Sequence, residues 1–225
     1  LYMFLLSAFQ VLLASYSGQE DIIVGSPVAG RTHPDIQGMR GMFINTIPMR
    51  GKPEQTKAVL QLLEEIKETS VEAFAHQSYP LEELIARLPL DRDTTRSPLF
   101  SVSFNMQNME VPALRLGDLH ISPYAIQHRS VKFDLSLEAF EREGELKLSL
   151  DYATALFKEE TVRRLGTHLL AIIREAIHHP DEQIGLLNIL DQHEQMERLE
   201  KKDEAQTNRH EPFHVQFSRQ AKETP

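Results

Sequence analysis

A single arginine follows a buried-strand pattern near the start of the chain. The stretch IIVGSPVAGR places Arg31 beyond an apolar, β-branched run and a loop of small residues. A guanidinium that is even half buried needs a carboxylate or other hydrogen-bond acceptors. The sequence therefore predicts an acceptor for Arg31, and it leaves open whether that acceptor lies in this chain.

Ten histidines invite a search for a metal site or a general base. His178 and His179 are adjacent and precede acidic residues, but neighbouring residues on a helix point about 100° apart. They stand at the expected end of a helix, where the dipole and the free carbonyl groups favour histidine. We interpret them as capping residues. His76 follows a helical pattern and precedes Pro80, so its default role is in a cap or a turn.

No complete catalytic set emerges from the residues alone. The chain contains no cysteine and no HExxH, Walker, EF-hand or G-x-S-x-G pattern. We therefore expect no metal site and no bound cofactor. The formal net charge of −9 argues against nucleic acid and anionic membranes as partners.

The N-terminal stretch LYMFLLSAFQVLLASYSG is apolar but shorter than the roughly 20 residues that a membrane span needs. No basic region precedes it, as a signal peptide would require. We expect a core helix that ends at Gly18, because glycine is common just after a helix. The absence of cysteine fits a cytoplasmic protein.

The spacing of apolar residues predicts the helices and strands that position these candidate residues. Together these elements indicate a mixed α/β domain. Helical spacing predicts helices over 1–17, 54–74, 81–88 and 158–177. Apolar runs and alternation predict strands over 21–24, 42–50, 100–107, 119–125, 133–139 and 146–152, the last two forming a hairpin. Residues 25–42 are expected to form a loop, and Pro48 indicates an edge strand or a strand end.

The expected strand over 100–107 has two different faces. Its apolar face fits a core, whereas its polar face either meets solvent or lines a substrate channel. The polar residues are Ser101, Ser103, Asn105 and Gln107. From this alternation, Ser103 and Gln107 are candidate channel residues.

The composition changes after Leu190. Residues 191–212 are charged and read as a linker, and an apolar pattern resumes over 213–225. We therefore expect a domain over 1–190, a linker over 191–212 and the start of another domain over 213–225. The chain is expected to be truncated at both ends.

Several stretches together resemble the condensation domains of nonribosomal peptide synthetases. IVGSPVAGR is similar to the family's GxPxxGR motif, GMFINTIPMR to its G-x-F-(V/I)-N-T motif, and AHQSYPLEELI to its HQxxPFE motif, with Leu81 in place of the usual Phe. The segments RDTTRSPLFSVSFNMQN, KFDLSL and LDYATALF also match. The resemblance covers about residues 1–190 in family order, and the tail from Phe213 is similar to the opening of an adenylation domain.

The resemblance implies an α/β fold: a chloramphenicol-acetyltransferase-like lobe with a mixed β-sheet packed with α-helices. A condensation domain has two such lobes, and thioesters carried on 4′-phosphopantetheine meet in a tunnel between them. The family's catalytic HHxxxDG motif belongs to the N-terminal lobe and is absent here. This chain therefore resembles the C-terminal lobe, and we expect the chain alone to be inactive and to contain no catalytic residue.

The resemblance also implies roles for individual residues. Arg31 would pair across the lobe interface with the aspartate of HHxxxDG, which lies outside this chain. Asn45 and His76, within their motifs, are candidates for structural or tunnel roles. The implied partners are the N-terminal lobe, peptidyl carrier proteins and the adjacent adenylation domain. The implied reaction is amide formation, in which the acceptor amine attacks the donor thioester.

Three alternatives stay open. A heterocyclisation domain differs chiefly in the N-terminal motif. An epimerisation domain is disfavoured by MFINTIPMR, because such domains usually depart from F-x-N-T. The third alternative is a non-catalytic module that recruits other proteins to an assembly line.

Overall fold

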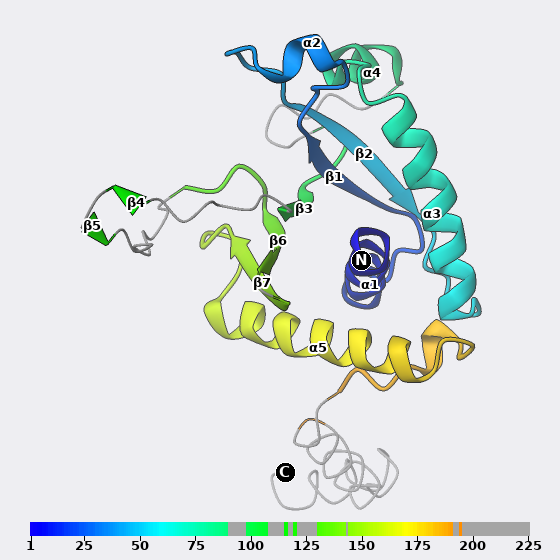
Figure 1. The fold of residues 1–225 in the computed structure, drawn as a ribbon. Helices are drawn as coiled ribbons and strands as arrows, with labels where there is room; N and C mark the ends of the chain where they lie inside the picture. The colour runs from blue at the N-terminus through cyan, green and yellow to red at the C-terminus, as the bar shows by residue number, and fades with distance from the viewer. Residues whose placement is uncertain are drawn as a thin grey trace, which may run out of the picture. The chain divides into compact units, whose positions relative to one another are not determined.

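The computed structural model describes residues 1–89, 98–107, 115–116, 119–120, 130–142, 144–190 and 194 (Figure 1). Residues Leu1–Ile189 form one compact unit. The expected linker over 191–212 and the expected domain start over 213–225 lie outside the described residues, apart from position 194. No helix in the described ranges is long and apolar enough to cross a membrane.

Thirteen elements make up the described part of the chain. They are α1 (Tyr2–Ser17), β1 (Ile22–Val28), α2 (Pro34–Gln37), β2 (Asn45–Gly51), α3 (Val59–Ala75), α4 (Leu81–Arg87), β3 (Val102–Gln107), β4 (Arg115–Leu116), β5 (Leu119–His120), β6 (Leu135–Arg142), β7 (Glu145–Tyr152), α5 (Glu159–His178) and the short 3₁₀ helix η1 (Ile184–Leu186). The expected helices and the hairpin are confirmed. Of the expected strand over 119–125, only β5 is described.

Five strands form a mixed sheet in the order β2-β1-β3-β6-β7. The pairs β1–β2 and β6–β7 are antiparallel, and β1–β3 and β3–β6 are parallel. β4 pairs only with β5, in a separate two-stranded sheet. The mixed sheet that the family resemblance implies is confirmed, and β2, which carries Pro48, is an edge strand as expected.

The predicted loop start at residue 25 is wrong. β1 runs through Gly25 and Pro27 to Val28, which pairs with Asn45. Gly25 and Pro27 favour a loop by their local propensity. Pairing with β2 along the whole strand overrides that propensity. An added Cβ at Gly25 would overlap the ring of Phe100, so glycine allows that ring to lie against the strand.

Helix α1 forms the centre of the core. Because its sequence is apolar nearly all round, the helix can be buried on every side. Its residues from Leu5 to Leu12 are all buried. The helix contacts α3, α5 and β1, and Figure 1 shows it between these elements. Gly18 ends it in the left-handed conformation, and its N–H donates to the Ala14 carbonyl, as the sequence predicts.

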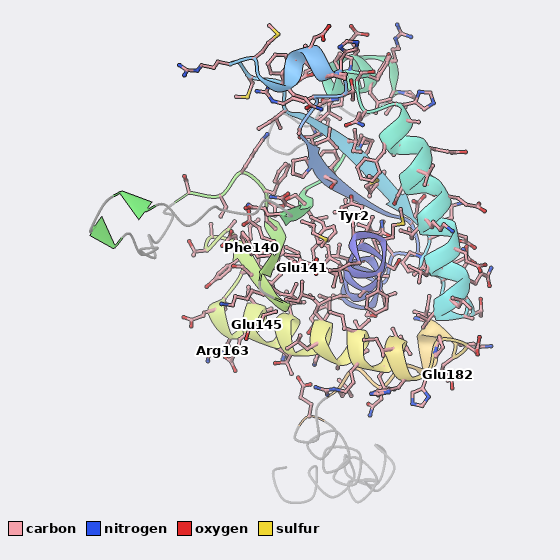
Figure 2. The ribbon with its side chains drawn as sticks, in the orientation of Figure 1. Tyr2, Phe140, Glu141, Glu145, Arg163 and Glu182 are labelled. Atoms are coloured by element: carbon pink, nitrogen blue, oxygen red, sulfur yellow. The ribbon has the colours of Figure 1, made fainter. Side chains whose placement is uncertain are left out.

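A buried polar chain connects α1 to the sheet. The Tyr2 hydroxyl donates to Ser26 Oγ at 2.8 Å, and Ser26 Oγ donates to the Phe104 carbonyl at 3.0 Å. Burial raises the pKa of the Tyr2 hydroxyl to about 12, so it stays a neutral donor. Tyr2 (labelled in Figure 2) also packs its ring against Phe104, with 5.2 Å between the ring centroids.

The end of α5 meets the start of α3. The first amide groups of a helix need acceptors from outside the helix. Here Val59 N–H donates to the Glu182 carbonyl, and Leu60 N–H donates to the Pro180 carbonyl. His179 is the C-terminal cap of α5, and its N–H donates to the Glu175 carbonyl. The capping interpretation of this histidine is confirmed.

Candidate functional site

Arg31 binds acceptors within its own loop. Its Nη1 donates to the carbonyl of Ile36 at 2.6 Å and to that of Met39 at 2.7 Å. Two longer contacts add to these. Nη1 donates to the Gln37 carbonyl at 3.4 Å, and Nη2 donates to the Gly41 carbonyl at 3.5 Å. The guanidinium therefore has acceptors in this chain, which the sequence left open.

The aromatic ring of Phe43, near the end of the loop, lies against the Arg31 guanidinium near its start. The Arg31 guanidinium carbon lies 4.4 Å from the centroid of the Phe43 ring, within the range of a cation–π contact. Gly30 has a φ of +64°, and a Cβ there would overlap the Phe43 carbonyl oxygen. The start and the end of this loop, residues 29–44, are thus in direct contact.

Asn45 joins this loop to a second motif. Its Nδ2 donates to the carbonyls of Gln77 and Tyr79, each at 2.8 Å, and its Oδ1 accepts from Thr46 N–H at 2.9 Å. Gln77 and Tyr79 lie in the turn between α3 and α4. The F-x-N-T-like and HQxxPFE-like motifs, more than thirty residues apart, therefore meet through one amide group.

His76 occupies the end of α3. It is the C-terminal cap, its N–H donates to the Ala73 and Glu72 carbonyls, and the residue is exposed. The next residue stabilises the same turn, because Gln77 Nε2 donates to the Phe74 carbonyl at 2.9 Å. The cap or turn role expected for His76 is confirmed.

Ser103 and Gln107 do not join the Arg31 loop through any hydrogen bond of the described residues. Ser103 is buried, lies opposite Gly25 and donates from Oγ to Ser136 Oγ at 2.8 Å, which couples β3 to β6. Gln107 is exposed at the end of β3. Ser103 thus has a cross-strand role, and a tunnel role for either residue stays a prediction.

A surface ion pair fixes the beginning of β1 to β2. Arg50 Nε and Nη2 donate to Asp21 Oδ1 and Oδ2 at 2.8 Å and 2.5 Å, in a bidentate geometry. The hydrogen bond from Arg50 holds the pKa of the Asp21 carboxyl below its usual value. This pair gives Arg50, the last residue of the GMFINTIPMR stretch, a structural role.

The lowered pKa predicts a small, pH-dependent stabilisation. Because the folded carboxyl titrates below the unfolded value of about 3.9, its contribution is present above that pH and is lost as the pH falls through the folded pKa. Asp21→Asn is expected to lower the thermal midpoint by about 2 °C or less at pH 7, since exposed pairs contribute little. Thermal unfolding of both proteins at pH 7 and pH 3 measures this, and an equal difference at both values would contradict it.

Sequence reasoning missed the aromatic partner of Arg31 and the backbone carbonyls that accept from Arg31 and Asn45. Phe43 and Tyr79 lie inside the recognised motifs, but those motifs carry no signal that names their contacts. Within the described ranges, this site supplies a cation, an amide and a set of backbone carbonyls. No nucleophile and base were found together there, so the residues can position a neighbouring group but do not themselves form a catalytic set.

Comparison with known proteins places this arrangement in a family. The chain is 56% identical over 225 residues to surfactin synthase subunit 2 of Bacillus subtilis, covering 100% of this chain and 6% of that protein. The solved four-domain nonribosomal peptide synthetase AB3403 matches 86% of this chain with a TM-score of 0.78 at 22% identity, over 16% of its own length.

A second solved structure matches the same fold. The X-domain from teicoplanin biosynthesis, in complex with OxyB, has a TM-score of 0.72 and 24% identity, covering 85% of this chain and 43% of its own. The condensation-domain profile matches residues 1–200. Together with the motifs around Arg31, Asn45 and His76, these matches show that the chain belongs to the condensation-domain family of nonribosomal peptide synthetases.

Proposed function

We propose that this chain is the C-terminal lobe of a condensation domain that joins carrier-bound aminoacyl or peptidyl thioesters through an amide bond. The family match over residues 1–200 carries the proposal. The chain spans 43% of the X-domain chain with the same fold, which supports one lobe of a two-lobe domain. The proposed setting is the cytoplasm, within a multidomain synthetase for an antibiotic-type peptide.

In the proposed reaction, the acceptor amine attacks the carbonyl carbon of the donor thioester. A C–N bond forms, the C–S bond breaks, and the phosphopantetheine thiolate leaves while the amine loses a proton. The proton acceptor would come from the N-terminal lobe. The contribution of this lobe is to hold its loop and part of the tunnel wall in place, because orientation of the reactants lowers the barrier.

Arg31 retains donors for a cross-lobe contact. A guanidinium has five N–H donors. Nη1 binds two close carbonyls, whereas Nη2 makes only the 3.5 Å contact with Gly41, and Nε has no hydrogen bond to a described residue. These groups are available for a carboxylate in the other lobe. The lobe-interface role of Arg31, with peptidyl carrier proteins and an adenylation domain as further partners, is part of the proposal.

The mass of the acceptor carrier protein tests the function. A complete domain containing this chain, mixed with loaded donor and acceptor carriers, is expected to transfer the donor acyl group to the acceptor amine. The 225-residue chain alone is expected to give no product. Further loss of water would indicate heterocyclisation. Inverted stereochemistry of the donor residue without transfer, detected by chiral chromatography after hydrolysis of the donor thioester, would indicate epimerisation. No covalent change under conditions that support a reference domain would favour the interaction module.

A further inference from the structure

We infer that Arg31 is a positioning residue that holds loop 29–44 in one conformation without help from a second lobe. The loop has little apolar packing of its own. Its one helix, α2, has four residues and none of them is buried. A segment with so few buried contacts is expected to open easily unless other interactions hold it. The guanidinium supplies those interactions.

The contacts of Arg31 reach the beginning, the middle and the end of the loop. The side chain starts at residue 31 and donates to the carbonyls of Ile36 and Met39. Carbonyls at the end of a helix lack partners within the helix, and a cationic side chain can satisfy them. Ile36 lies in the last turn of α2, so the guanidinium fixes the end of that turn.

Phe43 extends the same cluster to the far end of the loop. Its ring contacts the guanidinium, and its carbonyl lies beside Gly30. From there Asn45 connects the strand start to the α3–α4 turn. A continuous set of contacts therefore runs from the loop through β2 to the second motif.

The fixed loop presents apolar side chains to the surface. Met39, Met42 and Ile44 are 53%, 87% and 65% exposed. Their positions follow from the loop backbone, because Met39 itself provides a carbonyl to Arg31 and Met42 precedes the stacked Phe43. If the proposed function holds, loss of the Arg31 contacts displaces this surface in the complete domain.

Arg31→Lys in the chain alone tests the inference. Lysine keeps the charge but lacks the planar group that reaches several acceptors and stacks on a ring. Hydrogen exchange of the amides over residues 33–41 is expected to accelerate at least about tenfold, since the Ile36 and Met39 amides donate within this loop. The experiment needs no substrate, so its result does not depend on the proposed reaction.

Arg40→Lys is the matched control. Arg40 is exposed in the same loop, and its replacement is expected to leave exchange over 33–41 unchanged. Unchanged exchange in Arg31→Lys, or equal changes in both variants, would overturn the inference and leave Arg31 with a cross-lobe role alone. If Arg31→Lys fails to fold, hydrogen exchange of the wild-type chain tests the inference instead. Wild-type exchange over residues 33–41 at the rate of an unstructured peptide would overturn the inference.

A kinetic measurement separates positioning from general destabilisation. In the complete domain, Arg31→Lys is expected to lower kcat at least about tenfold with carrier KM within about twofold, at a temperature where the variant is folded. An unchanged kcat would contradict a positioning role in the reaction. Accelerated exchange without any amide-forming activity in the wild type would instead retain the loop role and reject the proposed function.

Discussion

Replacement of Gly30 by alanine is expected to disrupt loop 29–44 while leaving the sheet folded. Gly30 has a φ of +64°, which is strained for any residue with a Cβ. The added Cβ would also overlap the Phe43 carbonyl oxygen. The backbone at residue 43 must move, and the ring that contacts Arg31 moves with it.

Hydrogen exchange and thermal unfolding measure this effect. Exchange over residues 33–44 is expected to reach rates near those of an unstructured peptide, and the stability of the unit to fall by about 1–3 kcal/mol. Slow exchange over the same residues in Gly30→Ala would show that the contact between the two ends of the loop does not hold it together.

Gly18→Ala is the control for backbone strain. Gly18 has a similar φ of +69°, but nothing lies within 4 Å of an added Cβ. This variant is expected to lose only about 1–2 kcal/mol of stability, with normal exchange in loop 29–44. The comparison isolates the overlap with Phe43 from the cost of the left-handed conformation.

Phe104→Ala is expected to have the largest effect on stability, with a loss of about 3–5 kcal/mol. Phe104 is fully buried on β3, and its ring packs against Tyr2. The substitution leaves a cavity between α1 and the sheet, which the surrounding elements can fill only partly. Urea denaturation at equilibrium measures the difference in the free energy of unfolding.

Val71→Ala provides the matched comparison for the core variant. Val71 lies on α3 and is 56% exposed, so its truncation is expected to change stability by no more than about 0.5 kcal/mol. A loss below about 1 kcal/mol for Phe104→Ala would contradict the assignment of this ring to the centre of the core.

Elements with strong periodicity were predictable from the sequence. Helix α5 and the β6–β7 hairpin follow regular apolar spacing, and both lie within two or three residues of their predicted bounds. The second half of β1 could not be predicted, because Gly25 and Pro27 favour a loop locally. Pairing with β2, pairing with β3 at Gly25 and the ring of Phe100 explain why the chain stays extended there.

The sequence drew on motifs for its candidate residues, but it could not predict their contacts. The motifs singled out Arg31, Asn45 and His76. The acceptors of Arg31 and Asn45 are mainly backbone carbonyls, which every residue possesses, so side-chain types cannot identify them. The family resemblance implies a carboxylate partner for Arg31 outside the chain, whereas the described contacts of Arg31 are within the loop itself.

Single-turnover amide formation by the complete domain tests the central claim most directly, using Gly30→Ala and Gly18→Ala. The claim is that the loop held by Arg31 and Phe43 is this lobe's contribution to the condensation reaction. We expect Gly30→Ala to form the amide at least about 100-fold more slowly than wild type, and Gly18→Ala to stay within about twofold. A folded Gly30→Ala domain that forms the amide at the wild-type rate would contradict it.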